Sequence, residues 1–316
     1  MRSTHGSRAS AEAARRGGSE MTDRSKEGLW AWRQPENHNH MIALQEQAGD
    51  PPPHDGHVEL SYFGGSAFRI TAPSGLTLLI DPWRNPPWGN GDWFLHDFPS
   101  IAVDVALSTH AHFDHDGVHR VSAHTVLDRL IGTYEFAGVR ITGIADKHVC
   151  DSTHNAYDWA ETTRRLTAVK TSPPDNWRSF DNCLLLVEVA GLRILHWGDN
   201  RPNPPEHVWT QLGEIDVLLL PVDGSQHVLS HAQADAVAAK LAARLIVPHH
   251  YGISDVTTHS STLLPPDDWV NGREDSIWTE SGSFRLDPAF VRQQRNRVVC
   301  FGRHVAFDKT DLRRKP

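Results

Sequence analysis

The segment that most constrains this chain is Ser108–His115, which reads Ser-Thr-His-Ala-His-Phe-Asp-His. The preceding run, Val103–Leu107, is short and apolar, which is typical of a buried strand. Four metal-binding side chains fall within six positions of the segment: His110, His112, Asp114 and His115. They therefore lie on a loop at a strand end, where a rigid sheet can hold a reactive site.

The spacing of these residues suits two metal ions. In an extended chain, His110 and His112 project to the same side and can bind one ion. Asp114 and His115 are adjacent, so the chain must turn there, and they can reach a second ion. Imidazole and carboxylate without thiolate form a ligand set for Zn, Fe or Mn. The His-x-His spacing recurs at 38–40, but in a polar stretch that we interpret as solvated surface.

Composition limits the class of protein. The chain has 316 residues, 39% hydrophobic and 22% charged, which is typical of a soluble globular protein. The partner that we expect is a small-molecule substrate. The formal net charge of −8 disfavours nucleic acid as a partner, and no run is long enough for a membrane span. Three widely spaced cysteines, Cys150, Cys183 and Cys300, predict no disulfide framework and favour a reducing, cytoplasmic location.

The first part of the chain differs from the rest in composition. Residues 1–28 carry almost no large apolar side chains, so they cannot bury enough surface to form a core. Pro51–Pro53 marks a stiff linker. We therefore predict a disordered or loosely docked extension over 1–56 and one folded domain over 57–310.

Periodicity and turn residues predict the elements of that domain. Strands are expected at 58–63, 67–71, 76–80, 103–107, 126–130, 132–136, 139–144, 182–189, 192–197, 215–222, 245–248, 298–301 and 304–307. Short helices are expected at 118–123 and, after the capping box at Ser230–Gln233, to about Ala243.

The Ser108–His115 segment resembles the metal-binding signature of the metallo-β-lactamase superfamily. The resemblance is carried further by Leu-Ile-Asp-Pro at 79–82, His-Trp-Gly-Asp at 196–199, Asp-Val-Leu-Leu-Leu-Pro-Val at 216–222 and Pro-His-His-Tyr-Gly at 248–252. It is closest to the metal-dependent hydrolases that are similar to L-ascorbate-6-phosphate lactonase. The implied fold is α/β, an αββα four-layer sandwich with metals at one edge. The halves near 57–190 and 191–310 would each form one sheet.

The resemblance also implies a complete ligand set. His110, His112 and His148 would bind the first metal ion, and Asp114, His115 and His250 the second. Asp199 would bridge the two, because a carboxylate has two oxygens to share between cations. Asp81, at a strand end, would support the metal loop by hydrogen bonding.

Some positions in this set have rivals. His154 is the rival of His148, which we prefer because it follows its strand directly. His249 adjoins His250, and the family pattern Pro-x-His-Tyr favours His250. Whether His249 or His231 contributes to the site stays open, and His227 is a weaker candidate.

The implied function is that of a binuclear metal-dependent hydrolase. A metal-bound hydroxide would attack an ester, lactone or phosphoester, with Asp114 and Asp199 as catalytic residues. The cofactors would be two divalent metal ions, with Zn expected and Mn or Fe as alternatives. A phosphodiesterase or nuclease on the same scaffold, or a metal-binding protein without activity, are the alternative functions.

An aromatic loop follows the Asp81 strand end. Residues 83–99 contain Trp83, Trp88, Trp93, Phe94 and Phe98 among Pro and Gly. These aromatics either wall a substrate pocket or cover the edge of the sheet. The sequence does not separate the two interpretations.

Overall fold

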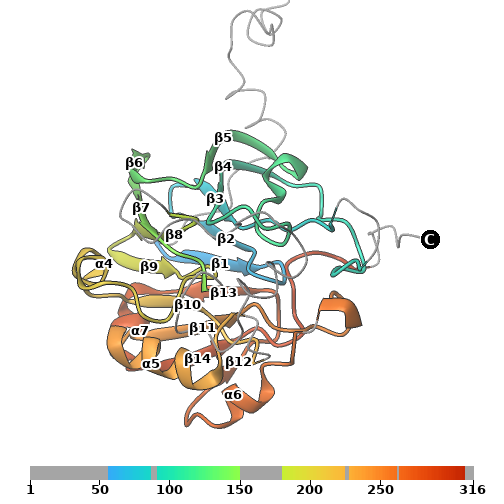
Figure 1. Cartoon of the computed structure of the whole chain (residues 1–316). Coiled ribbons are helices and arrows are strands. Elements are labelled where there is room, and N and C mark those ends of the chain that lie inside the picture. Colours follow the sequence, from blue (N-terminus) through green and yellow to red (C-terminus); the bar gives the residue numbers. More distant parts are fainter. Residues whose placement is uncertain (1–55, 87–90, 150–179, 225–227, 262, 310–316) are drawn as a thin grey trace, which may run out of the picture. The chain divides into compact units, whose positions relative to one another are not determined.

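Two β-sheets packed face to face form the body of the protein in the computed structural model (Figure 1). The structure describes residues 56–86, 91–149, 180–224, 228–261 and 263–309. The extension predicted for 1–56 therefore lies almost wholly outside the described residues. The described residues belong to one compact unit within Pro51–Pro316.

The first sheet has six strands in the order β13-β1-β2-β3-β4-β5. Strand β1 pairs antiparallel with both β13 and β2, whereas β3, β4 and β5 run parallel. The strands are β1 (Val58–Tyr62), β2 (Phe68–Thr71), β3 (Thr77–Ile80), β4 (Ala102–Ser108), β5 (Ser122–Asp128) and β13 (Ser283–Leu286).

The second sheet has eight strands in the order β12-β14-β11-β10-β9-β8-β7-β6. Strands β6 to β9 form an antiparallel meander, and β9, β10, β11, β14 and β12 run parallel. The strands are β6 (Gly132–Phe136), β7 (Val139–Asp146), β8 (Asn182–Val189), β9 (Leu192–His196), β10 (Val217–Pro221), β11 (Leu245–His249), β12 (Ile277–Trp278) and β14 (Arg297–Cys300). Parallel strands bring their carboxyl ends to one edge of the sheet.

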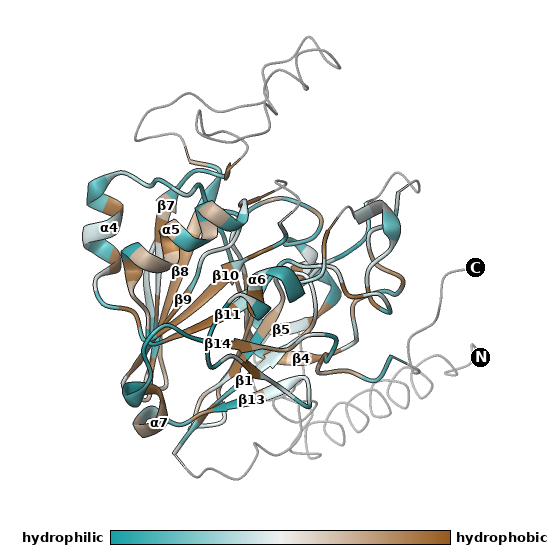
Figure 2. Ribbon diagram, turned by 90° about the horizontal axis from the view of Figure 1, so that it is seen from below, coloured by the Kyte–Doolittle hydropathy of each residue, from teal (hydrophilic) through white to brown (hydrophobic). Residues whose placement is uncertain are grey.

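Short helices flank the second sheet. They are α4 (Glu206–Leu212), α5 (His231–Leu241), α6 (Asp267–Asn271) and α7 (Pro288–Gln293), with the 3₁₀ turns η3 (Gly117–Arg120) and η5 (His259–Ser261). Helix α5 lies on the side away from the first sheet (Figure 1), and its capping box at Ser230 forms as predicted. Strands β8 to β11 are strongly hydrophobic, while α4 and α5 carry both kinds of residue (Figure 2). None of the described helices has the length and apolar composition needed to span a bilayer.

The hydrophobic core lies between the two sheets. Phe68 of β2 packs edge-on against His196 of β9 and His249 of β11, with ring centroids 6.0 and 5.8 Å apart. Tyr62 of β1 packs against Phe301, just after β14, at 5.4 Å. All five side chains are fully buried, so contacts across this layer fix the position of one sheet on the other.

The predicted sandwich of two mixed sheets is confirmed, but two local predictions are wrong. The helix expected at 118–123 is only the 3₁₀ turn η3, because β5 already begins at Ser122. The strand expected at 126–130 is this β5, which begins earlier than predicted; it is an edge strand with Val126 49% exposed, so no pattern of burial marks its start. The strand expected at 304–307 is irregular chain that contacts β1 through Ala306 N–H, which donates to Tyr62 O.

The division of the two sheets between the two halves of the chain is also wrong. Strands β6, β7 and β8 come from the first half but belong to the second sheet, and β13 comes from the second half but pairs with β1. The meander β6–β9 extends the second sheet by local antiparallel pairing. The pairing of Val58 with Leu286 joins distant segments, and no local pattern encodes it.

Gly143 of β7 is required because the backbone of Leu130 approaches it closely. A Cβ atom at this position would overlap the carbonyl group of Leu130. Because a backbone carbonyl cannot rotate away as a side chain can, Gly143→Ala is expected to lower the free energy of unfolding by about 1–3 kcal/mol. Urea denaturation measures this change.

Gly272 provides the control for this substitution. Its φ is −73°, and the nearest atoms to an added Cβ lie 3.7 Å away. Gly272→Ala is therefore expected to change the free energy of unfolding by less than about 0.5 kcal/mol. Equal effects of the two substitutions would contradict the steric argument.

Candidate metal centre

Seven side chains from four strand ends form two adjacent groups; His112 is exposed and the other six are buried. Within each group the potential ligand atoms all lie within 4.8 Å of one another. The first group is His110, His112 and His148, and the second is Asp114, His115, Asp199 and His250. The structure thus brings together all seven residues that the sequence predicted, from the ends of β4, β7, β9 and β11.

Asp199 lies between the two groups. Its Oδ2 is 3.4 Å from His148 Nε2 and 3.9 Å from His110 Nε2 in the first group. In the second group, Oδ1 is 3.3 Å from His115 Nε2 and Oδ2 is 3.5 Å from His250 Nε2. One carboxylate therefore faces both groups, as a bridging ligand must.

The metal loop after β4, residues 109–116, is held in place by hydrogen bonds at its carboxyl end. His115 N–H and Asp116 N–H both donate to His112 O at 2.9 Å, which forms the tight turn that the sequence required. The Arg84 guanidinium holds the Asp116 carboxylate with two hydrogen bonds of 2.7 and 3.2 Å. Gly117 N–H donates to Pro82 O at 2.6 Å. The loop is thus fixed on the segment that leaves β3.

Asp81 occupies the supporting position predicted for it. It adopts a left-handed conformation with φ 51° at the end of β3. Its carboxylate accepts hydrogen bonds from Thr109 N–H at 2.7 Å and Thr109 Oγ1 at 2.8 Å. Its Oδ2 also lies 2.8 Å from His115 Nδ1. When His115 Nδ1 donates this bond, Nε2 carries the free lone pair and points toward Asp199.

The adjacent histidines at the end of β11 have different surroundings. His250 has a φ of 57° and its N–H donates to Gly65 O at 2.8 Å, which turns its side chain into the second group. His249 points into the core, where Nδ1 lies 3.1 Å from Ser66 Oγ and the ring stacks on His196 at 4.8 Å. The geometry therefore places His250, and not His249, with the other candidate ligands.

The remaining histidine candidates stand apart from these groups. His231 begins α5, and its Nε2 approaches Gly224 rather than either group. His154 and His227 lie outside the described residues.

The protonation states of the candidate ligands differ between the two groups. Burial, reinforced by His115 and His112, holds the pKa of His110 well below its ordinary value, so the imidazole is neutral at pH 7. Its Nε2 is buried and makes no hydrogen bond to any described residue. Burial alone would raise the pKa of Asp199, but His115 and His250 hold it well below its usual range, so the carboxylate is ionised. Metal binding requires neutral imidazoles and ionised carboxylates, which His110 and Asp199 already provide. Burial lowers the pKa of His115 and His250, but Asp199 and Asp114 raise both above the ordinary value, so a cation bound there would displace a proton from each.

Sequence reasoning missed a set of buried polar residues beside the ligands. Asn200 directly follows Asp199, and Asp146 lies two positions before His148; both are buried. The available signal was their position at the ends of predicted strands, next to predicted ligands. Their pairing joins two separate strands, so it could not be recognised in the sequence.

The aromatic residues of the 83–99 loop have two kinds of surroundings: some are buried in the core, and one lies beside the metal loop. Trp83 stacks on Phe94 at 4.0 Å and meets Phe98 edge-on at 5.1 Å, and all three are buried in the core. Trp93 is half-buried and packs edge-on against Phe113 of the metal loop at 5.2 Å. Trp88 lies outside the described residues. Trp93 is therefore the described aromatic of this loop that adjoins the metal loop.

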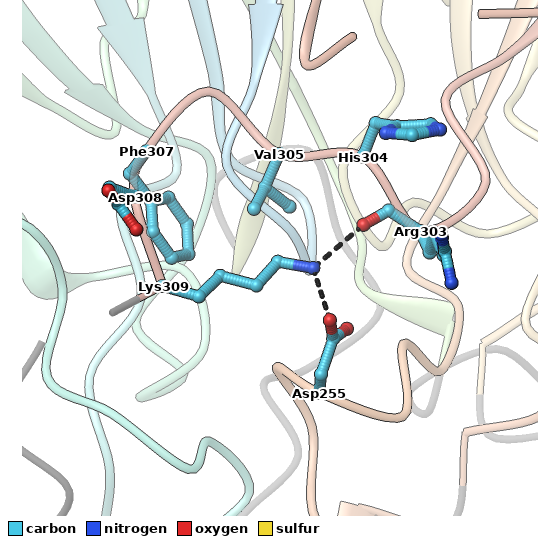
Figure 3. A pocket seen from close by; sticks show the side chains of 7 residues that line it. All are labelled: Asp255, Arg303, His304, Val305, Phe307, Asp308 and Lys309. Atoms are coloured by element: carbon cyan, nitrogen blue, oxygen red, sulfur yellow. Dashed lines mark hydrogen bonds and ion pairs between the residues drawn. The ribbon is translucent and has the colours of Figure 1, made fainter. Parts of the chain in front are cut away.

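An open pocket of about 420 Å³ lies elsewhere on the surface (Figure 3). It is lined by Asp255, Arg303, His304, Val305, Phe307, Asp308 and Lys309. Lys309 Nζ donates to Asp255 Oδ2 at 2.6 Å and to Arg303 O at 2.9 Å. No predicted ligand lines this pocket, so it is not the metal centre.

Asp81 and Asp104 provide a matched test of the support for His115. Each carboxylate accepts hydrogen bonds from the backbone N–H and the Oγ1 of one threonine, but only Asp81 reaches His115. Loss of an outer hydrogen bond to a ligand commonly costs about 10–100-fold in metal affinity. We therefore expect Asp81→Ala to weaken Zn binding by that factor in a chelator competition, and Asp104→Ala to leave it unchanged. Equal affinities in the two variants would show that Asp81 has no such role.

The comparisons with known proteins agree with this site. The β-lactamase superfamily domain matches residues 59–250. A UPF0173 metal-dependent hydrolase of Thermodesulfovibrio yellowstonii is 27% identical over 216 residues, covering 62% of this chain and 79% of that protein. Another from Methanosphaera stadtmanae is 29% identical over 204 residues, covering 61% and 84%.

A crystal structure from Thermotoga maritima, of a protein assigned to the metallo-β-lactamase superfamily, has the same fold. It aligns with a TM-score of 0.53 and 24% identity over 77% of this chain and 98% of that one. The domain match covers more than half of the sequence, and all seven predicted ligands fall within its limits of 59–250. The chain belongs to the metallo-β-lactamase superfamily.

Proposed function

We propose that this metal-dependent hydrolase works with two divalent cations, Zn before Mn or Fe. His110, His112 and His148 would hold one cation, and Asp114, His115 and His250 the other. The position of Asp199 carries the proposal, because its carboxylate faces imidazole nitrogens of both groups at 3.3–3.9 Å. The domain responsible would extend over 57–310.

Two such cations supply the chemistry of hydrolysis by lowering the pKa of a water molecule and polarising the scissile group of the substrate. Asp114 is buried, and its Oδ2 lies 3.2 Å from His250 Nε2 and 3.5 Å from His115 Nε2. We assign to it the orientation of the attacking water through a hydrogen bond. His112 is the exposed member of the first group, so substrate would approach from its side.

The substrate class that we propose is an ester, lactone or phosphoester. Support comes from the four sequence segments that resemble the relatives of L-ascorbate-6-phosphate lactonase, and from curated relatives named metal-dependent hydrolases. Phosphodiester cleavage on the same scaffold uses the same kind of ligand set, so the experiment must compare both substrate classes.

The decisive experiment combines elemental analysis of the purified protein with hydrolysis assays on a chromogenic phosphodiester and a panel of lactones. Two metal ions per chain and turnover of a lactone support the proposal. Turnover of the phosphodiester alone assigns the protein to the phosphodiesterases. A chain that binds no metal after reconstitution would refute the binuclear site.

Asp199→Ala tests the bridge directly. Removing the carboxylate that faces both groups should lower the metal content below two ions per chain and reduce kcat by at least about 100-fold, because the shared ligand holds both cations in place. Inductively coupled plasma analysis and steady-state kinetics measure these effects.

Asp216→Ala is the control for this variant. Asp216 accepts hydrogen bonds from Arg193 and Arg244. These residues lie at the amino ends of β9, β10 and β11, away from the candidate ligands at the carboxyl ends. The substitution should lower stability without changing metal content or kcat. Full activity of Asp199→Ala with two bound ions would contradict the assignment.

A further inference from the structure

A network of polar side chains joins the two segments that carry His148 and Asp199. The first segment leaves β7 and the second leaves β9, and β8 lies between these strands in the sheet (Figure 1). The two segments therefore meet beyond the start of β8 at Asn182, past the paired residues of these three strands. Their relative position must come from other contacts.

The centre of the network is an ion pair between Asp146 and Arg201. Arg201 Nε and Nη2 donate to Asp146 Oδ1 at 3.0 and 2.6 Å, and Nε also lies 3.2 Å from Oδ2. The Asp146 side chain is 2% exposed and that of Arg201 is 17% exposed. A guanidinium presents its donors as a rigid fork, so this pair fixes orientation as well as distance.

Two buried asparagines complete the network. Asn200 Nδ2 donates to Asp146 Oδ2 at 2.7 Å, and Asn182 Nδ2 donates to Asn200 Oδ1 at 2.9 Å. Both asparagines are fully buried. The contacts thus extend from the end of β7, through the segment after β9, to the start of β8.

Backbone hydrogen bonds transmit this arrangement to the ligands. Arg201 N–H donates to Lys147 O at 3.0 Å, and Val149 N–H donates to Asp199 O at 2.8 Å. His148 lies between these two bonds and forms an isolated β-bridge with Asn200. The backbone of His148 is therefore held against that of Asn200, the residue after Asp199, by a hydrogen bond on either side.

The other candidate ligands are positioned by different elements. His115 is held by Asp81 of the first sheet, and His250 by the backbone of Gly65. The Asp146–Arg201 network touches neither of these contacts. Its effect should therefore fall on the first group, which His148 completes.

We propose that Asp146 and Arg201 are positioning residues for the three-histidine metal site. They hold His148 at its place beside Asp199, so that the first cation is bound by a preformed set of ligands. This inference rests on the two-cation site of the proposed function and adds the device that assembles one half of it. Neither residue is assigned a contact with substrate.

The test is metal binding by Arg201→Ala, Arg201→Lys and the control Arg244→Ala. Arg244 forms a comparable pair with Asp216, Nε to Oδ1 at 3.0 Å, at the opposite edge of the same sheet. Thermal unfolding of each metal-free variant first establishes that it is folded. Competition with a chromophoric chelator then gives the Zn affinity of each site, and absorbance after Co²⁺ substitution reports the histidine environment.

For Arg201→Ala we expect one ion bound with wild-type affinity and the other about 10–100-fold more weakly, as for other outer contacts of metal ligands. Arg201→Lys keeps the charge but not the fork, so it should give an intermediate loss and an altered Co²⁺ spectrum. Arg244→Ala should bind both ions as the wild type does.

Two results would overturn the inference. One is wild-type affinity at both sites in Arg201→Ala, or in Arg201→Lys if the alanine variant does not fold. The other is the same loss in Arg201→Ala and Arg244→Ala. The readout separates this inference from the proposed reaction: a wild-type protein that binds two ions without turnover refutes the proposed substrate class and leaves the positioning test intact. A wild-type protein that binds no ion refutes both.

Discussion

The confinement of charged groups away from water is the constraint on which the rest of the structure depends. Asp81, Asp146 and Asp199 are all buried, and a buried carboxylate is costly unless it is paired and hydrogen-bonded. Each has a different compensation. Asp81 accepts hydrogen bonds from Thr109, Asp146 is paired with Arg201, and Asp199 faces the candidate metal ligands. Two of these charges are satisfied within the protein, whereas the third is satisfied by imidazoles that a cation would organise.

The packing of the two sheets against each other fixes the positions of the candidate metal ligands. The end of β4 belongs to the first sheet, and the ends of β7, β9 and β11 belong to the second. A site built from both sheets is only as well defined as their packing. Phe68 supplies part of that packing by contacting His196 and His249, which lie three positions before Asp199 and one position before His250, respectively. The core histidines thus connect the packing of the sandwich with the geometry of the metal centre.

The four candidate ligands after β4 were predictable from local sequence, whereas His148, Asp199 and His250 were expected from the family resemblance and from their positions after predicted strands. Residues 103–107 form an apolar strand followed by four candidate ligands, and His148 follows an alternating strand in the same way. The ligand order along the chain is local information, and the structure brings those residues together. The choice of His250 over His249 depended on the resemblance, since alternation alone shows only that the two face opposite ways.

The remainder depended on contacts between distant segments. The sheet to which β6–β8 belong is set by pairing rather than by composition. The start of the edge strand β5 at Ser122 was not predicted, because its largely exposed residues give no alternating pattern. The contact of Asp146 with Arg201 spans 55 positions. Either residue alone has the appearance of a surface charge beside a strand. Only the fold shows that both are turned toward the same interior space.

The pairing of β13 with β1 has a consequence for the order in which the molecule can be made. Val58 finds its partner Leu286 only after 228 further residues have been added to the chain. Ribosomes add roughly 5–20 residues each second. The edge of β1 that pairs with β13 therefore stays unpaired for on the order of ten seconds or more during synthesis. The metal loop and His250 are synthesised before that edge is closed. During synthesis, the candidate ligands are therefore all present before β13 completes the first sheet.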